Sequence, residues 1–195
     1  MRTRHRRTTG RDDAPLPTDE ELMQAVATGD EGALRELTGR WRRPLYAFLQ
    51  RAADGRETDD LYQETWLRVV RAARAFDPRR RFSTWLFQIA LNLSRDLRRR
   101  TLPETLPPDA LEQAADPGAS AAGVHGDARD AALDVRRLLR GLPEAQREVV
   151  TLRLLDDVPE DEVAQIVGCP RGTVKSRLHL GLARLAELAR AGERS

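Results

Sequence analysis

Aromatic, amide and guanidinium side chains alternate along residues 84–99 in a pattern that could bind single-stranded nucleic acid. At helical spacing, one face of this stretch carries Thr84, Phe87, Gln88, Leu91, Asn92, Arg95 and Arg99. A phenyl ring can stack on an unpaired base, an amide can bond to its edge, and a guanidinium can pair with a phosphate. The same composition fits an ordinary amphipathic helix with a solvated arginine end, so the residues alone leave both interpretations open.

A second candidate binding face lies on residues 60–74, where one apolar side chain interrupts a polar surface. Leu67 shares this helical face with Asp60, Gln63, Glu64, Arg68, Arg71 and Arg74. A single exposed leucine is common on protein surfaces and needs no special explanation. Flanked by amide and charged groups, it can also anchor a partner helix. Both interpretations stay open at this point.

Residues 159–185 have the pattern of a helix-turn-helix. A short apolar-periodic stretch ends at Gly168 and Cys169, and a second helical stretch begins near Pro170. The N-terminal half of the second stretch presents Arg171, Thr173, Lys175, Ser176, Arg177 and His179. In such motifs this part enters the major groove, where lysine and arginine read guanine or bind phosphate and hydroxyl groups hold phosphates.

Residue types that perform catalysis or bind metals are sparse. His5, His125 and His179 are scattered, and Cys169 is the only cysteine. These residues predict no internal disulfide and lack the Cys and His spacing of a zinc site. The GTVKS segment at residues 172–176 lacks the Gly-Lys-Ser/Thr ending of a phosphate loop. We therefore expect no enzyme activity, no metal and no cofactor.

Charge is distributed unevenly, although the formal net charge is only +2. Arginines crowd the N-terminus and residues 68–100, whereas residues 104–134 are acidic. This segregation predicts a basic surface for a polyanion, a disordered basic tail over residues 1–17 and a flexible acidic linker over residues 101–130. No apolar run reaches the roughly 18 residues of a membrane span and no signal-peptide core is present, so we expect a cytoplasmic protein.

Apolar residues recur at helical spacing on both sides of the linker. We therefore expect an all-α fold with two small helical domains, residues 18–100 and 131–195. Pro44 should kink or interrupt its helix. The expected N-caps are Thr18 (in a capping box with Glu21), Asp30, Thr58 and Ser83. Two of the expected helices lie between residues 58 and 100. The core-facing residues of the first should be Tyr62, Trp66, Val69, Val70, Ala73 and Phe76. Those of the second should be Phe82, Trp85, Leu86, Ile89, Ala90, Leu93 and Leu97.

Three blocks occur in a defined order on either side of the variable linker: DDLYQETWLRV (59–69), FDPRRRFSTWLFQIALNLSRDLRR (76–99), and LPEAQREVVTLRLLDDV (142–158) with EVAQIVGCPRGTVKSRL (162–178). In these blocks the chain resembles the extracytoplasmic-function (ECF) sigma factors of bacterial RNA polymerase. The resemblance covers about residues 18–100 and 133–188. It implies a factor that binds core polymerase and directs promoter recognition, DNA melting and transcription initiation, for a stress or envelope response.

The resemblance also implies roles for individual residues. Residues 18–100 would be sigma region 2 and residues 131–195 sigma region 4, with the linker threading the RNA exit path. The surface that docks on the polymerase clamp would comprise Asp60, Gln63, Glu64, Leu67 and Arg68. A flipped base of the proximal promoter box would be read by Phe87, Gln88, Asn92, Ser94, Arg95 and Asp96. The distal box would be contacted by Arg171, Thr173, Lys175, Ser176 and Arg177.

The implied partners are core RNA polymerase and promoter DNA, both as duplex and as melted nontemplate strand, with an anti-sigma protein as a further candidate. The chain departs from the family pattern at Pro159, where a capping serine is usual, and at Leu180 and Leu182, where basic residues are frequent. Two alternatives remain from the residues: a helix-turn-helix regulator that binds duplex DNA without polymerase, and a sigma-like decoy that only binds proteins.

Overall fold

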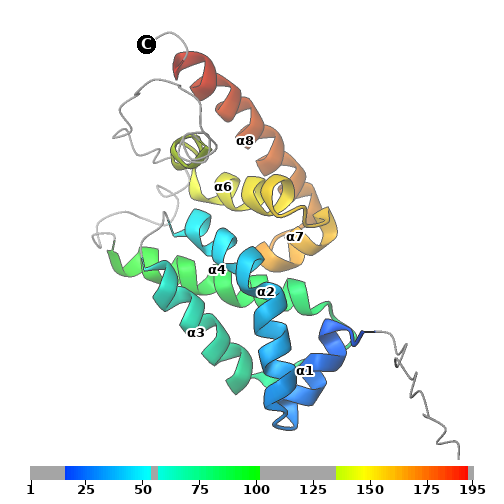
Figure 1. The fold of residues 1–195 in the computed structure, drawn as a ribbon. Helices are drawn as coiled ribbons and strands as arrows, with labels where there is room; N and C mark the ends of the chain where they lie inside the picture. Colours follow the sequence, from blue (N-terminus) through cyan, green and yellow to red (C-terminus); the bar gives the residue numbers. More distant parts are fainter. Residues whose placement is uncertain (1–15, 54–56, 102–134, 193–195) are drawn as a thin grey trace, which may run out of the picture.

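The computed structural model describes residues 16–53, 57–101 and 135–192, and all regular structure in these ranges is helical (Figure 1). The predicted all-α fold is therefore confirmed. Residues 1–15 of the expected tail and residues 102–130 of the expected linker lie outside the described residues. Residues 135–140 form a helical stretch before α6. The other elements are α1 (Asp19–Ala27), α2 (Glu31–Ala52), α3 (Thr58–Arg71), η1 (Ala73–Ala75), α4 (Phe82–Thr101), α6 (Glu144–Val150), η2 (Thr151–Leu155), α7 (Glu160–Val167) and α8 (Arg171–Gly192).

The first two helices begin at the N-caps that the sequence predicts. The hydroxyl of Thr18 accepts from the Glu21 backbone N–H at 3.2 Å, and the Glu21 carboxylate accepts from the Thr18 N–H at 2.8 Å. Asp30 accepts from the N–H groups of Gly32 and Ala33. These bonds satisfy backbone donors that a helix start leaves without partners. Both predictions are confirmed.

The N-caps expected for the next two helices are wrong. Thr58 is already the first residue of α3, and Glu57 before it has a left-handed backbone without a side-chain cap. For α4, the helix begins one residue earlier than Ser83, and the backbone N–H of Phe82 donates to Glu20 of α1 at 2.8 Å. A carboxylate from a distant helix therefore replaces the local cap, which sequence spacing could not show.

Pro44 does not interrupt its helix, because α2 runs continuously from Glu31 to Ala52. Proline removes the N–H that would bond to the carbonyl four residues earlier, here that of Arg40. Both residues are exposed, so water can hydrate that carbonyl. The helix is therefore not interrupted at Pro44, and the alternative of a kink there stays a prediction.

Aromatic side chains from α2, α3 and α4 build the core of the N-terminal domain. Phe82 is fully buried, and its ring lies within 6.5 Å of the rings of Trp41, Trp66 and Phe76, centroid to centroid. The second predicted core stripe is buried or half-buried throughout. In the first stripe Val70 is wrong, because it is 43% exposed while Leu61 is buried. The buried face of α3 thus runs through Leu61, Thr65 and Val69, turned away from Val70.

The C-terminal domain contains the predicted helix-turn-helix, formed by α7 and α8. Gly168 ends α7 with φ +75°, a backbone conformation that glycine adopts without steric cost. Val163, Ile166 and Val174 are buried and form the apolar contact between the two helices. Across the domain α8 packs tightly on α6, since a Cβ added at Gly181 would lie only 2.7 Å from Val150 Cγ2. The orientation of the recognition helix is therefore fixed by α6 as well as by the turn.

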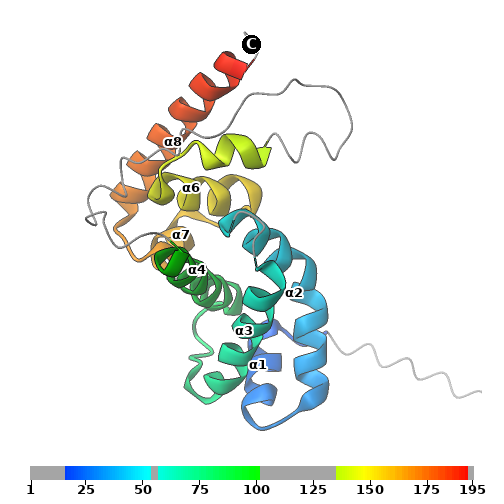
Figure 2. The same ribbon diagram turned by 90° about the vertical axis from the view of Figure 1, so that its left-hand side faces the viewer.

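The two domains are in direct contact, which the sequence did not predict. The C-terminal domain lies over one end of the N-terminal domain in both views (Figures 1 and 2), with α7 against α4 and η2 against α2. One cluster of buried apolar residues runs through both domains. None of the helices described in either domain has the length and hydrophobicity that crossing a bilayer requires.

Candidate partner and nucleic-acid surfaces

The surface of α3 that carries Leu67 is exposed and mixed in polarity. Leu67 is 49% exposed, and Asp60 and Gln63 beside it are exposed as well. Glu64 and Arg68 are half-buried and form an ion pair at 3.1 Å, one helical turn apart. The structure therefore brings together all five residues predicted for a protein partner, around an accessible apolar side chain. We call these five residues the α3 face.

On α4, only part of the predicted DNA-reading set is accessible. Asn92 is exposed, and Gln88 and Asp96 are half-buried. Phe87 is 4% exposed, and Ser94 is completely buried with its hydroxyl donating to the Ala90 carbonyl. The expectation that Phe87 lies on an exposed face is wrong, and the same holds for Thr84 and Leu91, which are buried.

Phe87 is buried because α2 lies across this side of α4. Its ring meets that of Phe48 at 5.0 Å and that of Trp41 at 5.8 Å, both edge to face. Such pairs add stabilisation beyond the burial of apolar area. Because α4 is covered on two sides, its accessible polar surface is narrow and includes Asn92, with Gln88 and Asp96 partly exposed beside it. The periodicity of α4 signalled this by placing apolar residues such as Leu91 on both faces.

Arg95 contacts the C-terminal domain instead of solvent. Its guanidinium forms a two-pronged contact with Glu148 of α6, with Nε to Oε1 at 2.9 Å and Nη2 to Oε2 at 2.6 Å. The hydrogen bond to Glu148 is the main reason that the pKa of Arg95 is raised. Arg98, one turn later, bonds to Glu144 and Glu148 and to the Ala52 carbonyl. Sequence reasoning did not include Arg98, Glu144 or Glu148 in any site.

At the start of α8, the predicted distal contacts are accessible but partly engaged by acidic neighbours. Arg171 bonds to Glu160 at 2.7 Å and pairs with Asp161 at 2.9 Å, both in the first turn of α7. The Glu160 hydrogen bond is the largest contribution that raises the pKa of Arg171. Lys175 Nζ lies 4.0 Å from Glu160 and is otherwise exposed. The first turn of α7 thus places acidic side chains beside both basic residues at the start of α8.

The remaining distal residues line the same end of α8. Ser176 is exposed and donates to the Thr173 carbonyl, while Thr173 and Arg177 are half-buried. Pro159 precedes α7 without a side-chain cap, as its residue type implies. Leu180 and Leu182 are 55% and 42% exposed on α8. The five predicted distal residues are thus brought together on the N-terminal half of one helix.

Comparison with known proteins decides the family. A family model described as "Sigma-70 region 2" matches residues 37–102, and one described as "Sigma-70, region 4" matches residues 132–185. The ECF RNA polymerase sigma-E factor of Escherichia coli K12 is 30% identical over 169 residues, which span 83% of this chain and 88% of that protein. The chain belongs to the ECF sigma factors. It is similarly related to the sigma-E factor of Haemophilus influenzae, with 28% identity over 173 residues.

Solved structures show the same fold for this sigma factor. The structure of CnrH in complex with the cytosolic domain of CnrY matches with a TM-score of 0.66 and 28% identity, over 89% of this chain and 97% of that one. The sigma factor RpoE of Bartonella quintana, solved with the anti-sigma factor NepR, matches with a TM-score of 0.62 and 22% identity, over 80% and 98% of the two chains. The second likeness concerns the fold alone.

The family relation places the surfaces in the sigma factor's two matched regions. The α3 face and α4 fall within the region 2 match, and α7 with most of α8 falls within the region 4 match. Among the described residues there is no group of three or more His, Cys, Asp or Glu side chains that could hold a metal ion.

Proposed function

We propose that this sigma factor docks on core RNA polymerase through the α3 face and places α4 and α8 on the two promoter boxes. The exposure of Leu67 within the polar α3 face is the observation that carries the proposal. An accessible leucine surrounded by Asp60, Gln63 and an ion pair offers one apolar anchor with a polar rim, the arrangement found where protein interfaces concentrate their binding energy. The factor acts without catalysis of its own.

Leu67→Arg tests the docking surface. The substitution places a charge where we propose that polymerase covers the leucine, so the affinity for core polymerase should fall by at least about a hundredfold, as for a hot-spot residue. Leu154→Arg is the matched control, because Leu154 is 50% exposed on the other domain. Binding is measured with labelled protein and purified core polymerase, and circular dichroism checks helicity. Equal affinities of both variants would remove the α3 face from the interface.

For the proximal box, we propose that Gln88, Asn92 and Asp96 supply accessible polar contacts of α4, together with Arg95, which Glu148 engages in the described arrangement. Amide and carboxylate groups can bond to the edges of an unpaired base, and arginine can bind the adjacent phosphate. Phe87 and Ser94 are both buried in the described arrangement, so they lie beneath this surface and do not form part of it. Their direct contact with DNA remains a prediction from family resemblance.

For the distal box, we propose that the first turns of α8 enter the major groove of duplex DNA. Arg171, Thr173, Lys175, Ser176 and Arg177 lie on the N-terminal half of this helix, where helix-turn-helix proteins contact base edges and phosphates. Arg171 would then either contact DNA and these carboxylates at the same time or break its bonds to Glu160 and Asp161. Because it bonds to both carboxylates, we propose that only part of its guanidinium contacts DNA.

Transcription with purified components tests the whole function. The sigma factor is mixed with core RNA polymerase and a library of genomic fragments, and initiated transcripts are sequenced. We expect initiation at a small set of promoters that share two boxes. A duplex-only regulator would bind DNA without polymerase, and a decoy would bind protein without supporting initiation, so either result would refute the proposal.

We further propose that the factor works in the cytoplasm, where core polymerase and the chromosome are, and serves a stress or envelope response. The sigma-E names of its relatives support that class of regulon. An anti-sigma protein is proposed as its negative regulator. The related CnrH, at 28% identity, was solved with a bound partner domain, which supports looking for such a protein.

A further inference from the structure

The start of α8 carries a basic residue where helices usually favour an acidic one. Arg171 is the first residue of α8, and the first turn of this helix contains no acidic side chain. The N-terminus of a helix carries a partial positive charge, so a cation there is electrostatically unfavourable. Arg171 pairs instead with carboxylates of the preceding helix, those of Glu160 and Asp161 in the first turn of α7.

Glu160 is more enclosed than the arginine that it binds. The Glu160 side chain is 21% exposed, whereas that of Arg171 is 59% exposed. Glu160 is also the first residue of α7, where the partial charge of the helix favours a carboxylate. An ion pair with one mostly exposed partner contributes little to stability. Its main physical consequence is that it restricts where the Arg171 guanidinium can point.

The contacts leave one edge of the guanidinium available. Glu160 Oε1 accepts from Nε of Arg171 at 2.7 Å, and Nε has only one N–H group. Asp161 Oδ1 lies 2.9 Å from Nη1. Nη1 and Nη2 have two N–H groups each, and within the described part of the chain no contact engages Nη2. The edge formed by Nη1 and Nη2 can therefore bond to a partner with two acceptors.

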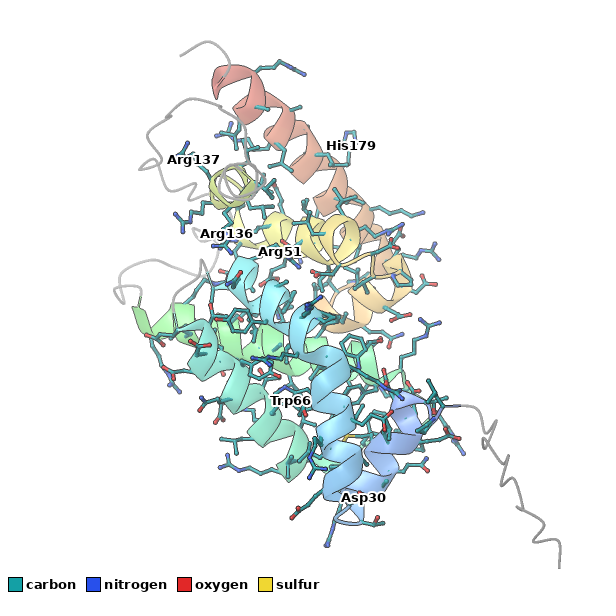
Figure 3. The ribbon with its side chains drawn as sticks, in the orientation of Figure 1. Asp30, Arg51, Trp66, Arg136, Arg137 and His179 are labelled. Carbon is teal, nitrogen blue, oxygen red and sulfur yellow. The ribbon has the colours of Figure 1, made fainter. Side chains whose placement is uncertain are left out.

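Arg171 lies at the border of the exposed face of α8. Lys175, Ser176 and His179 share this face, since all three are exposed and lie three or four residues apart. Figure 3 shows the His179 side chain on the side of α8 away from α6. Arg171 precedes Lys175 by one turn and contacts α7. Duplex DNA on this face would therefore meet Arg171 together with the first turn of α7.

Charge decides which DNA group this edge prefers. Glu160 also lies 4.0 Å from Lys175 Nζ. The two carboxylates thus balance the charges of Arg171 and Lys175, so the group as a whole attracts a phosphate only weakly. Guanine is neutral and presents two acceptors, O6 and N7, in the major groove, which match two N–H groups of an arginine. The available edge therefore favours a guanine over a phosphate.

We propose that Glu160, supported by Asp161, is a positioning residue that directs Arg171 to a guanine of the distal box. Glu160 acts through Arg171 and does not need to touch the base. Without the carboxylate the guanidinium can turn to phosphates, which occur at every position of DNA and carry no sequence information. The pair thus sets sequence specificity. This inference rests on the proposed function, because it concerns the bases that the distal-box helix selects.

Two substitutions at Glu160 test the positioning role in the full chain. Glu160→Gln keeps the side-chain length but replaces a charge-assisted hydrogen bond with a weaker neutral one, and Glu160→Ala removes the acceptor. Asp157→Asn is the matched control. It removes the same charge from a nearby position, and Asp157 pairs with Arg153 rather than with a residue of α8. Thermal melting checks that each variant is folded.

Base preference is measured by selection from randomised duplex DNA, with the full chain alone and with core polymerase, followed by sequencing of the bound DNA. The parent should prefer guanine at one position by about fivefold to a hundredfold, as for a bidentate arginine contact, and Arg171→Ala should abolish this preference. Glu160→Gln should reduce it by about threefold or more, and Glu160→Ala should reduce it further. Asp157→Asn should retain it.

Salt dependence supplies a readout that a merely structural role would not change. Affinity for a labelled duplex of unrelated sequence is measured by anisotropy at several salt concentrations. In Glu160→Gln, Arg171 should bind about one additional phosphate, so the slope of log affinity against log salt should steepen by about 0.9 relative to Asp157→Asn. In an Arg171→Ala background, Glu160→Gln should alter neither the base preference nor the slope beyond the control.

Two results would overturn the positioning role. One is the parent's guanine preference retained in both Glu160 variants. The other is the absence of any guanine preference that depends on Arg171, including selection of no sequence by the parent. Transcription by the parent with core polymerase separates this inference from the proposed function. If the parent initiates while the Glu160 variants select the parent's bases, the positioning role fails alone. If the parent does not initiate, the proposed function fails, and selection by the chain alone still decides the positioning role.

Discussion

Mild acidification should stabilise this sigma factor through Asp156. Only 6% of the Asp156 side chain is exposed, and burial raises its pKa from 3.8 to about 6. The ion pair with Arg51 acts in the opposite direction but is the smaller effect. The folded protein therefore binds the carboxyl proton more tightly than the unfolded chain does. Breaking an ion pair by protonation should, in this case, favour the folded state.

The sign and size of the effect follow from linkage between protonation and folding. Between pH 3.8 and about 6 this carboxyl is protonated in the folded protein and ionised in the unfolded chain, so the free energy of unfolding falls as pH rises. One pKa unit corresponds to about 1.4 kcal/mol, which gives a total of about 3 kcal/mol for this group. The stabilisation is complete below pH 3.8 and is lost as pH rises through about 6.

Urea denaturation of the parent and Asp156→Asn at pH 7 and pH 5 measures this effect. Asparagine is neutral at both pH values, so subtracting the variant's change removes the contribution of all other titrating groups. We expect the parent to gain about 1 kcal/mol relative to the variant between pH 7 and pH 5. Asp157→Asn, at the exposed neighbouring position with a left-handed backbone that asparagine tolerates, should behave like the parent. A relative loss of stability of the parent on acidification would refute the reasoning and show that the pair with Arg51 outweighs desolvation.

Three further substitutions test the helices that carry the binding surfaces. Glu20→Ala removes the acceptor for the Phe82 N–H and should lower the free energy of unfolding by about 1–2 kcal/mol in urea, whereas the exposed control Gln24→Ala should cost less than about half of that. Phe87→Ala should cost about 3–5 kcal/mol, because the ring is packed between aromatic side chains, and a cost below about 1 kcal/mol would contradict its burial. Arg171→Ala should weaken binding to distal-box duplex DNA by about 1–3 kcal/mol in an anisotropy titration, and unchanged affinity would exclude this residue from the interface.

Local features of the fold were predictable because their causes lie within a few residues. Thr18 and Glu21 form their capping box through contacts three residues apart, and Gly168 ends α7 with the backbone that glycine favours. The exposure of Leu67 also followed from helical spacing. The N-cap of α4 did not, because the acceptor for Phe82 comes from Glu20, which is 62 residues away.

The candidate site was predictable only in part. Residue types and spacing placed the α3 face and the distal set of α8 on single helix surfaces, and the structure shows each set together there. For α4 the same reasoning identified Asn92 as exposed but also placed Phe87 there, which is buried under α2. Apolar residues such as Leu91 on both faces of α4 indicated a second covered side, but the sequence of one helix does not show which neighbour covers it or which residues stay accessible.

The sequence by itself determined most of the helices, the turn at Gly168 and the family of this protein, because helical periodicity, turn residues and motif blocks are properties of neighbouring residues. Only the tertiary structure decided which surfaces are open. Arg95 and Glu148 are 53 residues apart, on either side of the acidic linker segment, and nothing near either residue specifies the other. Their pairing depends on how the two domains pack, which is set by apolar contacts and charges distributed over both domains.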